Sequence, residues 1–475
     1  MRLILAALSG VLLWVAYDQV IWFFAVIAIA IYLRLLRLQS KRNRLLITVM
    51  FFTTYWLLVI QWIQVLGVIP WILLTVVCVI PYLLLALVPL ARLTLFRANM
   101  VASAWVIAEF IHSEIPWDGF PWGLVAYTQT DGPLVESARI GGQFLTSYLV
   151  VLIAALASAL PRIASLASIA AISCVVAFVT LLLPDPAAQS VINVATVQGS
   201  VPRNGYDLET QRRAVLNNHV AASRELLNTN TKQLAMVVWP ENAADNDPIN
   251  NSRVNAIINE LSSDFGQVPI LIGGVVQQED GASELNAGIL WQSGIPGQMY
   301  AKQQLVPFGE YIPTGNLFRS WIESQFPVVP KFVSGEYSGL FTLPSGATFG
   351  DVICFEIANE NFVQDLVKEG AQFITVQTNN ATYLETSQPA QQLNISRFRA
   401  IENQRDIVVA ATTGATVIIN SNGEVVDQLA NQEQGFLVGE VSLLNDKQLV
   451  HVWGSRAVVI LCLIMYLYGI RKFRL

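Results

Sequence analysis

Long apolar runs fill the first 185 residues of the chain, and one more lies near its end. Polar or basic breaks separate these runs at intervals that suit helices crossing a bilayer, each of which needs about 20 residues. The pattern predicts seven membrane spans before the central region and an eighth after it. We place them near residues 3–18, 20–36, 45–65, 68–91, 98–113, 142–160, 166–184 and 456–470.

Lysines and arginines gather in alternate connections between these runs. They lie at 34–44, at Arg92 and Arg97, at Arg162 and at 471–474. If basic loops face the cytoplasm, both ends of the chain are cytoplasmic and residues 185–450 lie outside. Arg2 before a short first run also fits a signal peptide, but the further spans and the lack of a clear small-x-small cleavage site favour a retained helix.

The central region has a different pattern, in which β-branched apolar runs alternate with amphipathic or polar helical stretches. This alternation is typical of a layered α/β domain. The expected strands are 191–197, 234–239, 268–275, 286–291, 348–354, 372–377, 407–412 and 416–420, and the expected helices are 207–229, 249–263, 359–369 and 388–404. Residues 303–347 show little periodicity and are expected to form a long functional loop. The domains are therefore a seven-helix transmembrane domain at 1–185, an extracytoplasmic domain at 190–445 and a C-terminal transmembrane helix at 453–471.

Composition supports a membrane protein. Hydrophobic residues make up 54% of the chain and charged residues 13%, against about 25% charged in soluble domains. The net charge is -6 and no long basic run lies outside the apolar part, which argues against a nucleic-acid partner. Three of the four cysteines, Cys78, Cys174 and Cys462, fall in apolar runs and are expected to pack there.

Three residues of the central region follow strand-like runs and suit a cysteine nucleophile site. Glu241 follows the run at 234–239, Lys302 follows Gly297–Tyr300, and Cys354 ends the run that begins at Phe349. Ligands usually lie at the carboxyl ends of strands in α/β sheets. A carboxylate there can take the thiol proton, and an ammonium can stabilise an oxyanion.

Each of these residues also has an ordinary structural interpretation. A lone cysteine after a strand is often a small buried hydrophobe, a glutamate can begin a helix, and a lysine is most often a solvated cation. Spacing alone does not show that Glu241, Lys302 and Cys354 converge. Glu109, near the end of the fifth apolar run, is either functional because of its membrane depth or simply hydrated near the outer surface.

The three segments resemble the Glu-Lys-Cys motifs of the nitrilase superfamily of carbon–nitrogen hydrolases. More narrowly, the chain resembles the apolipoprotein N-acyltransferases, the membrane branch of that superfamily. Residues 302–310 and 311–313 are similar to the lysine motif of that branch, and residues 119–134 are similar to a segment that soluble nitrilases lack. The chain departs from the family at Gln304, where histidine is frequent, and at Phe355, where tyrosine is common.

The resemblance implies a polytopic α-helical membrane domain joined to an α-β-β-α sandwich. It makes Glu241 the general base, Lys302 the oxyanion stabiliser and Cys354 the nucleophile, with Glu310 and Glu356 orienting Lys302 or the substrate. It also implies a bacterial plasma-membrane acyltransferase without metal or cofactor. A fatty acyl chain passes from a membrane phospholipid, through a thioester, to the N-terminal amine of diacylglyceryl-cysteine in an apolipoprotein.

Two rival functions follow from other interpretations of the same residues. A membrane-anchored amidase would use the same three groups on a small C–N substrate, with water as acceptor. A transporter or scaffold would carry the central domain as an inactive relic, but its spans would be expected to hold more polar residues. The segment around Phe120-Pro121-Trp122 argues against the amidase, and the intact Glu, Lys and Cys argue against the relic.

Overall fold

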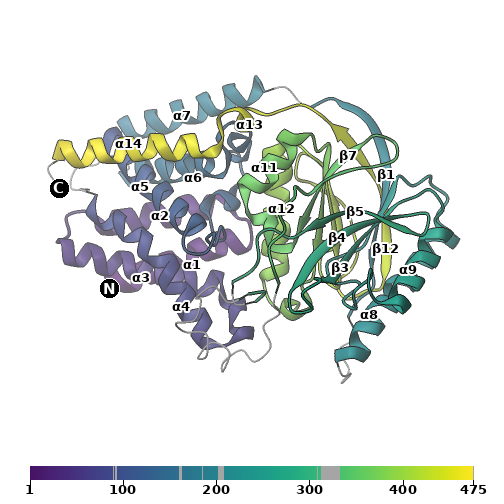
Figure 1. The fold of residues 1–475 in the computed structure, drawn as a ribbon. Helices are drawn as coiled ribbons and strands as arrows, with labels where there is room; N and C mark the ends of the chain where they lie inside the picture. The colour runs from purple at the N-terminus through teal and green to yellow at the C-terminus, as the bar shows by residue number, and fades with distance from the viewer. Residues whose placement is uncertain are drawn as a thin grey trace. The chain divides into compact units, whose positions relative to one another are not determined.

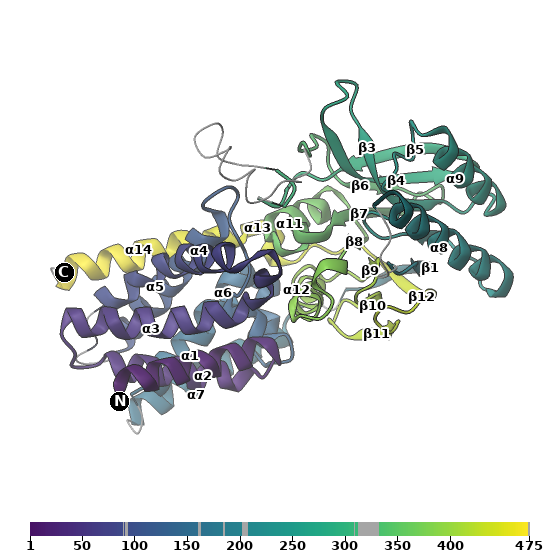
Figure 2. The same cartoon turned by 90° about the horizontal axis from the view of Figure 1, so that it is seen from below.

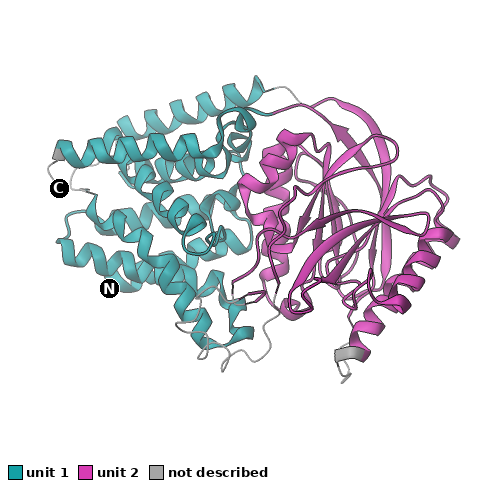
Figure 3. Cartoon of the chain, viewed as in Figure 1, with its two compact units in different colours: residues 1–185, 448–475 teal, residues 186–447 magenta. Residues whose placement is uncertain are grey.

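The computed structural model describes residues 1–88, 90, 94–159, 163–183, 186–201, 208–307, 309–311 and 332–473. The chain divides into two compact units (Figure 3). One unit joins residues 1–185 to residues 448–475 and is helical, and the other, residues 186–447, is built on two β-sheets.

The helical unit has a helix at each of the eight segments where the apolar pattern predicts a span. Its α-helices are α1 (Arg2–Asp18), α2 (Trp22–Leu36), α3 (Lys41–Val59), α4 (Val68–Val79), α5 (Leu95–Glu114), α6 (Ala138–Ala157), α7 (Ile163–Leu181), α13 (Leu449–Trp453) and α14 (Ser455–Phe473). Short 3₁₀ helices lie between them: η1 (Gln61–Leu66), η2 (Ile80–Leu87), η3 (Val125–Gln129) and η4 (Val135–Ser137). Although it comes last in the chain, α14 packs beside α5 and α6, as Figure 2 shows.

Three stretches among the described residues are long and apolar enough to cross a membrane: Val68–Leu87, Val135–Ala157 and Ile163–Leu181. They fit a membrane location for this unit. The cysteines of the unit divide in their burial. Cys78 and Cys462 are buried as expected. Cys174 on α7 is exposed, so the expectation that it packs against other residues of the chain is wrong. Most side chains of α7 lie on the surface of the helical unit.

The segment after α5 is not α-helical, yet it is buried inside the helical unit. In an apolar interior every main-chain N–H and C=O group needs a partner. Side chains from four helices supply these partners. Tyr17 and Tyr55 bond the N–H and the C=O of Gly123, Glu109 accepts from the N–H of Val125, and Ser147 accepts from that of Ala126.

Glu109 is fully buried, with 0% of its surface exposed. Its Oε1 atom accepts hydrogen bonds from the indole of Trp105 and from the main-chain N–H of Val125, both at 2.9 Å. The interpretation that Glu109 is hydrated near the surface is therefore wrong. Through its bond to Val125, Glu109 ties the non-helical segment to α5.

The second unit contains two six-stranded sheets. The first has the order β12-β1-β2-β3-β4-β5 and the second the order β11-β10-β9-β8-β7-β6. The strands of the first sheet are β1 (Ala188–Gln198), β2 (Met236–Val238), β3 (Ile270–Gln277), β4 (Glu284–Gln292), β5 (Ile295–Ala301) and β12 (Gly435–Leu444). Those of the second are β6 (Leu340–Thr342), β7 (Thr348–Ile353), β8 (Phe373–Thr378), β9 (Ile407–Ala411), β10 (Val417–Ile419) and β11 (Val425–Gln428).

Helices cover the outer faces of this sandwich (Figure 1). They are α8 (Leu208–Thr229) and α9 (Ser252–Asp264) on one side and α11 (Glu360–Glu369) and α12 (Gln388–Asn403) on the other. Neighbouring residues of a strand point to opposite faces. Accordingly, Val237 packs with the helices of the first sheet, whereas Met236 and Val238 pack between the two sheets. The result is the layered α/β arrangement that the alternating pattern predicts.

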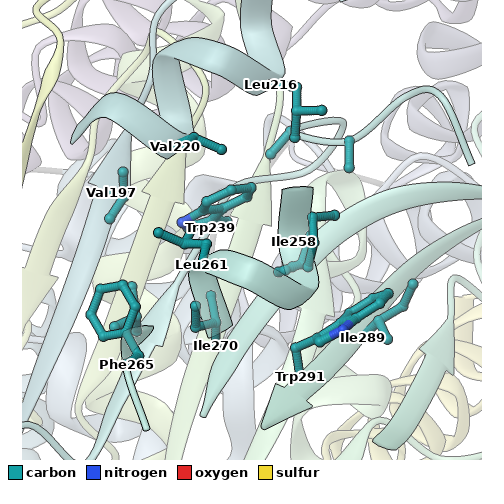
Figure 4. Close-up of a cluster of buried hydrophobic side chains, with 14 of the residues drawn as sticks. Val197, Leu216, Val220, Trp239, Ile258, Leu261, Phe265, Ile270, Ile289 and Trp291 are labelled. Atoms are coloured by element: carbon teal, nitrogen blue, oxygen red, sulfur yellow. The ribbon is translucent and has the colours of Figure 1, made fainter. Parts of the chain in front are cut away.

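The apolar cluster beneath α8 and α9 fixes this side of the sandwich (Figure 4). Trp239, which follows β2, lies in it together with Leu261 of α9 and Ile270 of β3. The indole N–H of Trp239 donates to the hydroxyl of Ser223 at 2.9 Å. Because the Trp239 side chain is buried and hydrogen-bonded, it holds in place the main chain that leads to Glu241.

The first and the last strand of the sandwich along the chain, β1 and β12, pair with each other. β1 and β12 run antiparallel, with Ala188 opposite Leu444 at one end and Gln198 opposite Gly435 at the other. β12 was not among the expected strands, and neither were β6 and β11. All three are edge strands of their sheets.

Candidate active site

Three strands of the sandwich lead to the residues singled out in the sequence. Glu241 follows β2, Lys302 follows β5, and Cys354 follows β7 in the opposite sheet. Glu241 is 5% exposed and Lys302 is 1% exposed, whereas Cys354 is half-buried. A lysine and a glutamate are almost never this deeply buried without a charged partner. The partners of these two residues therefore define the site.

The ammonium of Lys302 lies between two carboxylates. Its Nζ atom donates to Oε1 of Glu310 at 2.9 Å and to Oε1 of Glu241 at 3.4 Å. The amide of Asn286, on β4, donates to the same two oxygens at 3.1 and 2.7 Å. Four side chains thus form one buried network, which joins Glu241 to Lys302 and Glu310 of a distant segment of the chain.

Two opposing effects act on the pKa of Lys302. Burial alone lowers this pKa, but the carboxylates of Glu310 and Glu241 outweigh it, so the net direction is upward. The amine therefore stays protonated at neutral pH. A fixed positive charge at this point can stabilise negative charge that develops on a reacting carbonyl oxygen.

Cys354 opens a short 3₁₀ turn, η5 (Cys354–Ala358), directly after β7. Its backbone is in the left-handed region, with φ at 55°, which is uncommon for a residue other than glycine. Two residues hold it there: Gln392 of α12 donates to the Cys354 carbonyl oxygen at 3.0 Å, and the Thr378 hydroxyl donates to Sγ at 3.5 Å. The turn takes the thiol out of the line of the strand.

Burial raises the pKa of the Cys354 thiol to about 12, and the negative charge of Glu241 acts in the same direction. Lys302 and the Thr378 hydroxyl oppose this shift without reversing it. Within the described residues no hydrogen bond joins Sγ to Glu241 or Lys302, and these two residues act on the thiol through their charges. The resting thiol is thus neutral, and a base must take its proton when it attacks.

Glu356 joins the lysine segment to the strand that carries the cysteine. Its Oε1 atom accepts hydrogen bonds from the Tyr300 hydroxyl at 2.7 Å and from the main-chain N–H groups of Gln303 and Gln304 at 2.8 and 3.0 Å. Its Oε2 atom accepts from the N–H of Ile353 at 2.8 Å. Glu356 thus binds main-chain groups on both sides of the site, and its expected role in orienting Lys302 or the substrate stays a prediction.

Several polar residues of the site did not emerge from the sequence pattern. Besides Asn286, Thr378 and Gln392, the main-chain N–H of Asn379 donates to Oε2 of Glu241 at 2.9 Å. Thr378 and Asn379 stand at the end of β8, and polar residues directly after a buried strand are the available signal. Asn286 lies within β4 and carries no such signal, because its partners come from other strands.

Some expected features lie outside the described residues. These are Arg92, Arg162, Phe308 and residues 312–331, a large part of the expected functional loop. Among the residues that are described, no group of three or more histidine, cysteine, aspartate or glutamate side chains is placed to hold a metal ion.

Comparison with known proteins places each unit in a family. Residues 193–445 match the carbon–nitrogen hydrolase family, and residues 9–156 match the apolipoprotein N-acyltransferase N-terminal domain. The solved structure of Nit3 from Saccharomyces cerevisiae, a member of branch 10 of the nitrilase superfamily, is similar over 55% of this chain and 92% of its own, at 15% identity and a TM-score of 0.41. By its family match, the sandwich is a carbon–nitrogen hydrolase domain.

Curated relatives cover both units. An apolipoprotein N-acyltransferase of Pseudomonas paraeruginosa is 31% identical over 72% of this chain and 67% of its own length. One of Mycolicibacterium smegmatis is 32% identical over 69% of this chain, and the match spans 60% of that relative's length. The chain belongs to the apolipoprotein N-acyltransferase family. This confirms the resemblance drawn from residues 119–134 and 302–313 and does not favour the amidase rival.

Proposed function

We propose that the chain transfers a fatty acyl group from a membrane phospholipid to the N-terminal amine of diacylglyceryl-cysteine in apolipoproteins, by way of a thioester on Cys354. The single observation that carries this proposal is the buried Lys302 ammonium held between Glu241 and Glu310, with a neutral thiol close enough to feel all three charges. Family membership supports the substrates, which are lipid and lipoprotein.

In the first half of the reaction, Glu241 takes the proton of the Cys354 thiol as sulfur attacks the ester carbonyl carbon. A carbon–sulfur bond forms, and the carbonyl oxygen becomes an oxyanion beside the Lys302 ammonium. The carbon–oxygen bond of the ester then breaks. Glu241 returns the proton to the departing oxygen, which leaves as the hydroxyl group of a lysophospholipid. The acyl group stays on sulfur as a thioester.

In the second half, the amine of the acceptor attacks the thioester carbon. Glu241 now removes a proton from the amine, a carbon–nitrogen bond forms, and Lys302 again faces the oxyanion. The carbon–sulfur bond breaks, and sulfur takes the proton back from Glu241. The products are the amide and the original thiol. The chemistry of these steps uses no metal or cofactor.

Membrane attachment gives this reaction its substrates. Both donor and acceptor carry acyl chains, so an enzyme embedded by apolar helices can meet them without extracting the chains from hydrocarbon. We place the catalytic domain on the extracytoplasmic side of a bacterial plasma membrane, with both termini cytoplasmic, because basic residues mark alternate loops. An impermeant thiol reagent applied to intact cells should then modify Cys354; reaction only in inverted vesicles contradicts this orientation.

Labelled phospholipid tests the proposal directly. Wild-type enzyme, supplied with donor alone, should accumulate an acyl label that hydroxylamine releases, and mass spectrometry should place it on Cys354. Cys354→Ala should carry no label, whereas Cys174→Ala, which removes an exposed cysteine from α7, should be labelled like wild type. Label that persists on Cys354→Ala contradicts the assignment. If water hydrolyses the acyl adduct but an acceptor amine does not remove it, the amidase alternative would be restored.

A further inference from the structure

Asp351 is a fully buried carboxyl group that the mechanism above does not use. It lies on β7, three residues before Cys354, and 0% of its surface is exposed. Its Oδ1 atom accepts a hydrogen bond from the Thr375 hydroxyl at 2.8 Å. Its Oδ2 atom receives no hydrogen bond from any residue that the structure describes. A buried carboxylate oxygen without a donor is costly.

Gln377, on the neighbouring strand β8, presents a similar unmatched atom. Its amide Nε2 donates to the carbonyl oxygen of Trp239 at 2.5 Å. A carbonyl oxygen can only accept, so the atom facing it must be the amide nitrogen, and the orientation of this amide is settled. The remaining atom, Oε1, is buried and finds no donor in the described part of the chain.

The two unmatched oxygens converge on one point of the opposite sheet. A Cβ atom built on Gly288 of β4 would lie 2.2 Å from Oδ2 of Asp351 and 2.6 Å from Oε1 of Gln377. Only glycine fits beneath them. If Asp351 were ionised, its negative oxygen would face the negative end of an amide dipole; if it were protonated, Oδ2 would become a donor and Oε1 its acceptor.

The electrostatic surroundings agree with the protonated form. Burial raises the pKa of Asp351 to about 8, and Glu356 adds to the shift, while the Thr375 hydroxyl and the main-chain N–H of Val352 oppose it without reversing it. The titratable groups that interact with it are Glu356 of η5 and Tyr300 of β5. The adjoining strands β6 and β8 contain no titratable side chain, and the one in β4 is Glu284 at its start.

We propose that Asp351 is a neutral carboxylic acid in the folded enzyme and donates a hydrogen bond to Gln377, forming a positioning link behind the site. The link runs from Thr375 through Asp351 and Gln377 to the carbonyl of Trp239, and so joins the two sheets. Trp239 lies two residues before Glu241. Thr378 and Asn379, which contact the Cys354 thiol and Glu241, directly follow Gln377.

Stability as a function of pH tests the proton without any assumption about the reaction. A carboxyl group whose pKa is raised in the folded state binds a proton that the unfolded chain has lost, so its presence lowers stability as pH rises from about 4 to about 8. Asparagine imitates the protonated acid and does not titrate. Asp351→Asn, made in the full-length chain in detergent, should therefore raise the unfolding temperature by about 3 °C or more near pH 8, and by less near pH 5.

Asp406 offers a matched control. It is also buried, but both of its oxygens accept main-chain N–H groups, from Ser421 at 2.8 Å and from Ser442 at 2.7 Å. Asp406→Asn would set an amide N–H₂ against an N–H donor and should lower the unfolding temperature at both pH values. An Asp351→Asn variant that behaves like this control, losing stability at both pH values, would overturn the proposal.

Infrared difference spectra give a second readout of the proton. The carbonyl stretch of a protonated carboxyl should disappear from the wild-type minus Asp351→Asn comparison when the sample is titrated above about pH 9, one unit past the raised pKa. It should be absent from the wild-type minus Asp406→Asn comparison at neutral pH. A wild-type spectrum without this band for Asp351 at neutral pH contradicts a neutral acid.

The positioning role rests on the proposed function, since its readout is the rate at which the thioester forms. Wild type should lose this rate as pH rises through about 8, and Asp351→Asn should keep it to higher pH. Gln377→Met, which cuts the link, should reduce the turnover number about tenfold or more with little change in KM. If the rate of thioester formation depends on pH in the same way in wild type and in Asp351→Asn, the Asp351 carboxyl has no positioning role. If no thioester forms in any variant, the proposed function fails while the stability test of the proton still stands.

Discussion

A buried glutamate of the helical unit and one of the sandwich have nearly the same exposure and very different partners. Glu109 accepts hydrogen bonds from the indole of Trp105 and from the main chain at Val125, and both donors are neutral. Glu241 faces the ammonium of Lys302 as well as neutral amide donors. Burial of a carboxyl group is therefore common to both units. In the sandwich, a buried carboxyl has a charged partner at the candidate site and also in the fully buried pair of Arg399 and Glu402.

Glu356 shows that the same contrast exists inside the sandwich. It takes its hydrogen bonds from Tyr300 and from three main-chain N–H groups, like Glu109 in the other unit. Carboxyl groups with neutral donors fix backbone, whereas Glu241 and Glu310 fix a charge. Substitutions at residues of both kinds test this distinction.

Lys302→Met removes the charge that Glu241 and Glu310 share and leaves two buried carboxylates facing each other. We expect it to slow thioester formation by about 10²–10³-fold and to cost about 3–5 kcal/mol of unfolding free energy. Acyl-adduct kinetics and denaturant unfolding measure the two effects. Lys368→Met is the control, because Lys368 also pairs with a carboxylate, Asp365, at 2.8 Å, but on the surface. Similar losses in both variants would refute the special place of Lys302.

Glu109→Leu leaves the N–H groups of Trp105 and Val125 without an acceptor in an apolar interior. The expected cost is about 2–4 kcal/mol of unfolding free energy, because each buried donor left unpaired costs about 1–3 kcal/mol. Thioester formation per folded molecule should stay within about twofold of wild type, since no reacting group is touched. Glu109→Gln, which retains the accepting oxygen, should be milder. A selective loss of chemistry in Glu109→Leu would erase the contrast between the two units.

His219 of α8 is a buried group of the sandwich with neutral partners, and it makes the contrast visible through pH. Burial lowers its pKa to about 4, and its Nδ1–H donates to the Val215 carbonyl at 2.8 Å. Between about pH 6.5 and pH 4, His219 binds a proton in the unfolded chain but not in the folded chain. The free energy of unfolding therefore falls as the pH is lowered to 4, by at most about 3 kcal/mol. His219→Phe should flatten this fall in pH-dependent denaturant unfolding. If the unfolding free energy of His219→Phe falls at acid pH as much as that of wild type, His219 is not the group that causes the fall.

The smallest effect should come from an ion pair at the surface. Arg224 and Glu260 approach to 2.9 Å, but their side chains are 50% and 67% exposed. Arg224→Ala should change the unfolding free energy by about 0–0.5 kcal/mol and leave thioester formation unaltered. Denaturant unfolding at low and high salt provides the measurement. A loss comparable to that of Lys302→Met would mean that burial is not what separates the two pairs.

The sequence predicted central strands better than edge strands. The runs expected at 191–197, 348–354, 372–377 and 407–412 all fall on strands of the structure. The strands that were not expected, β6, β11 and β12, lie at sheet edges. All four residues of β11 are exposed, and β12 carries half-exposed residues along most of its length. An edge strand is stabilised by hydrogen bonds to one neighbour and needs no continuous apolar run, so its pattern is weak.

For the candidate site, the sequence supplied residue types and strand ends but not partners across the sheets. Glu241, Lys302 and Cys354 were found because each follows a strand-like run and matches a family motif; their catalytic roles stay predictions. Asn286 and Gln392 were missed because they lie on β4 and α12 and contact residues of distant segments. Such a contact produces no pattern in the neighbouring sequence. The left-handed backbone of Cys354 was equally invisible, since the residue is not glycine.

The pairing of β1 with β12 has a consequence for how such a chain could arise. Because Ala188 lies opposite Leu444, the sandwich begins and ends at one place, as an inserted domain must if its host is to tolerate it. The helical unit has the order that a host would have: its chain leaves after α7 and resumes at α13, which packs against α6, and at α14, which packs against α5 and α6. One genetic event, the insertion of a hydrolase module into a loop of a helical protein, would be sufficient to produce this order of segments.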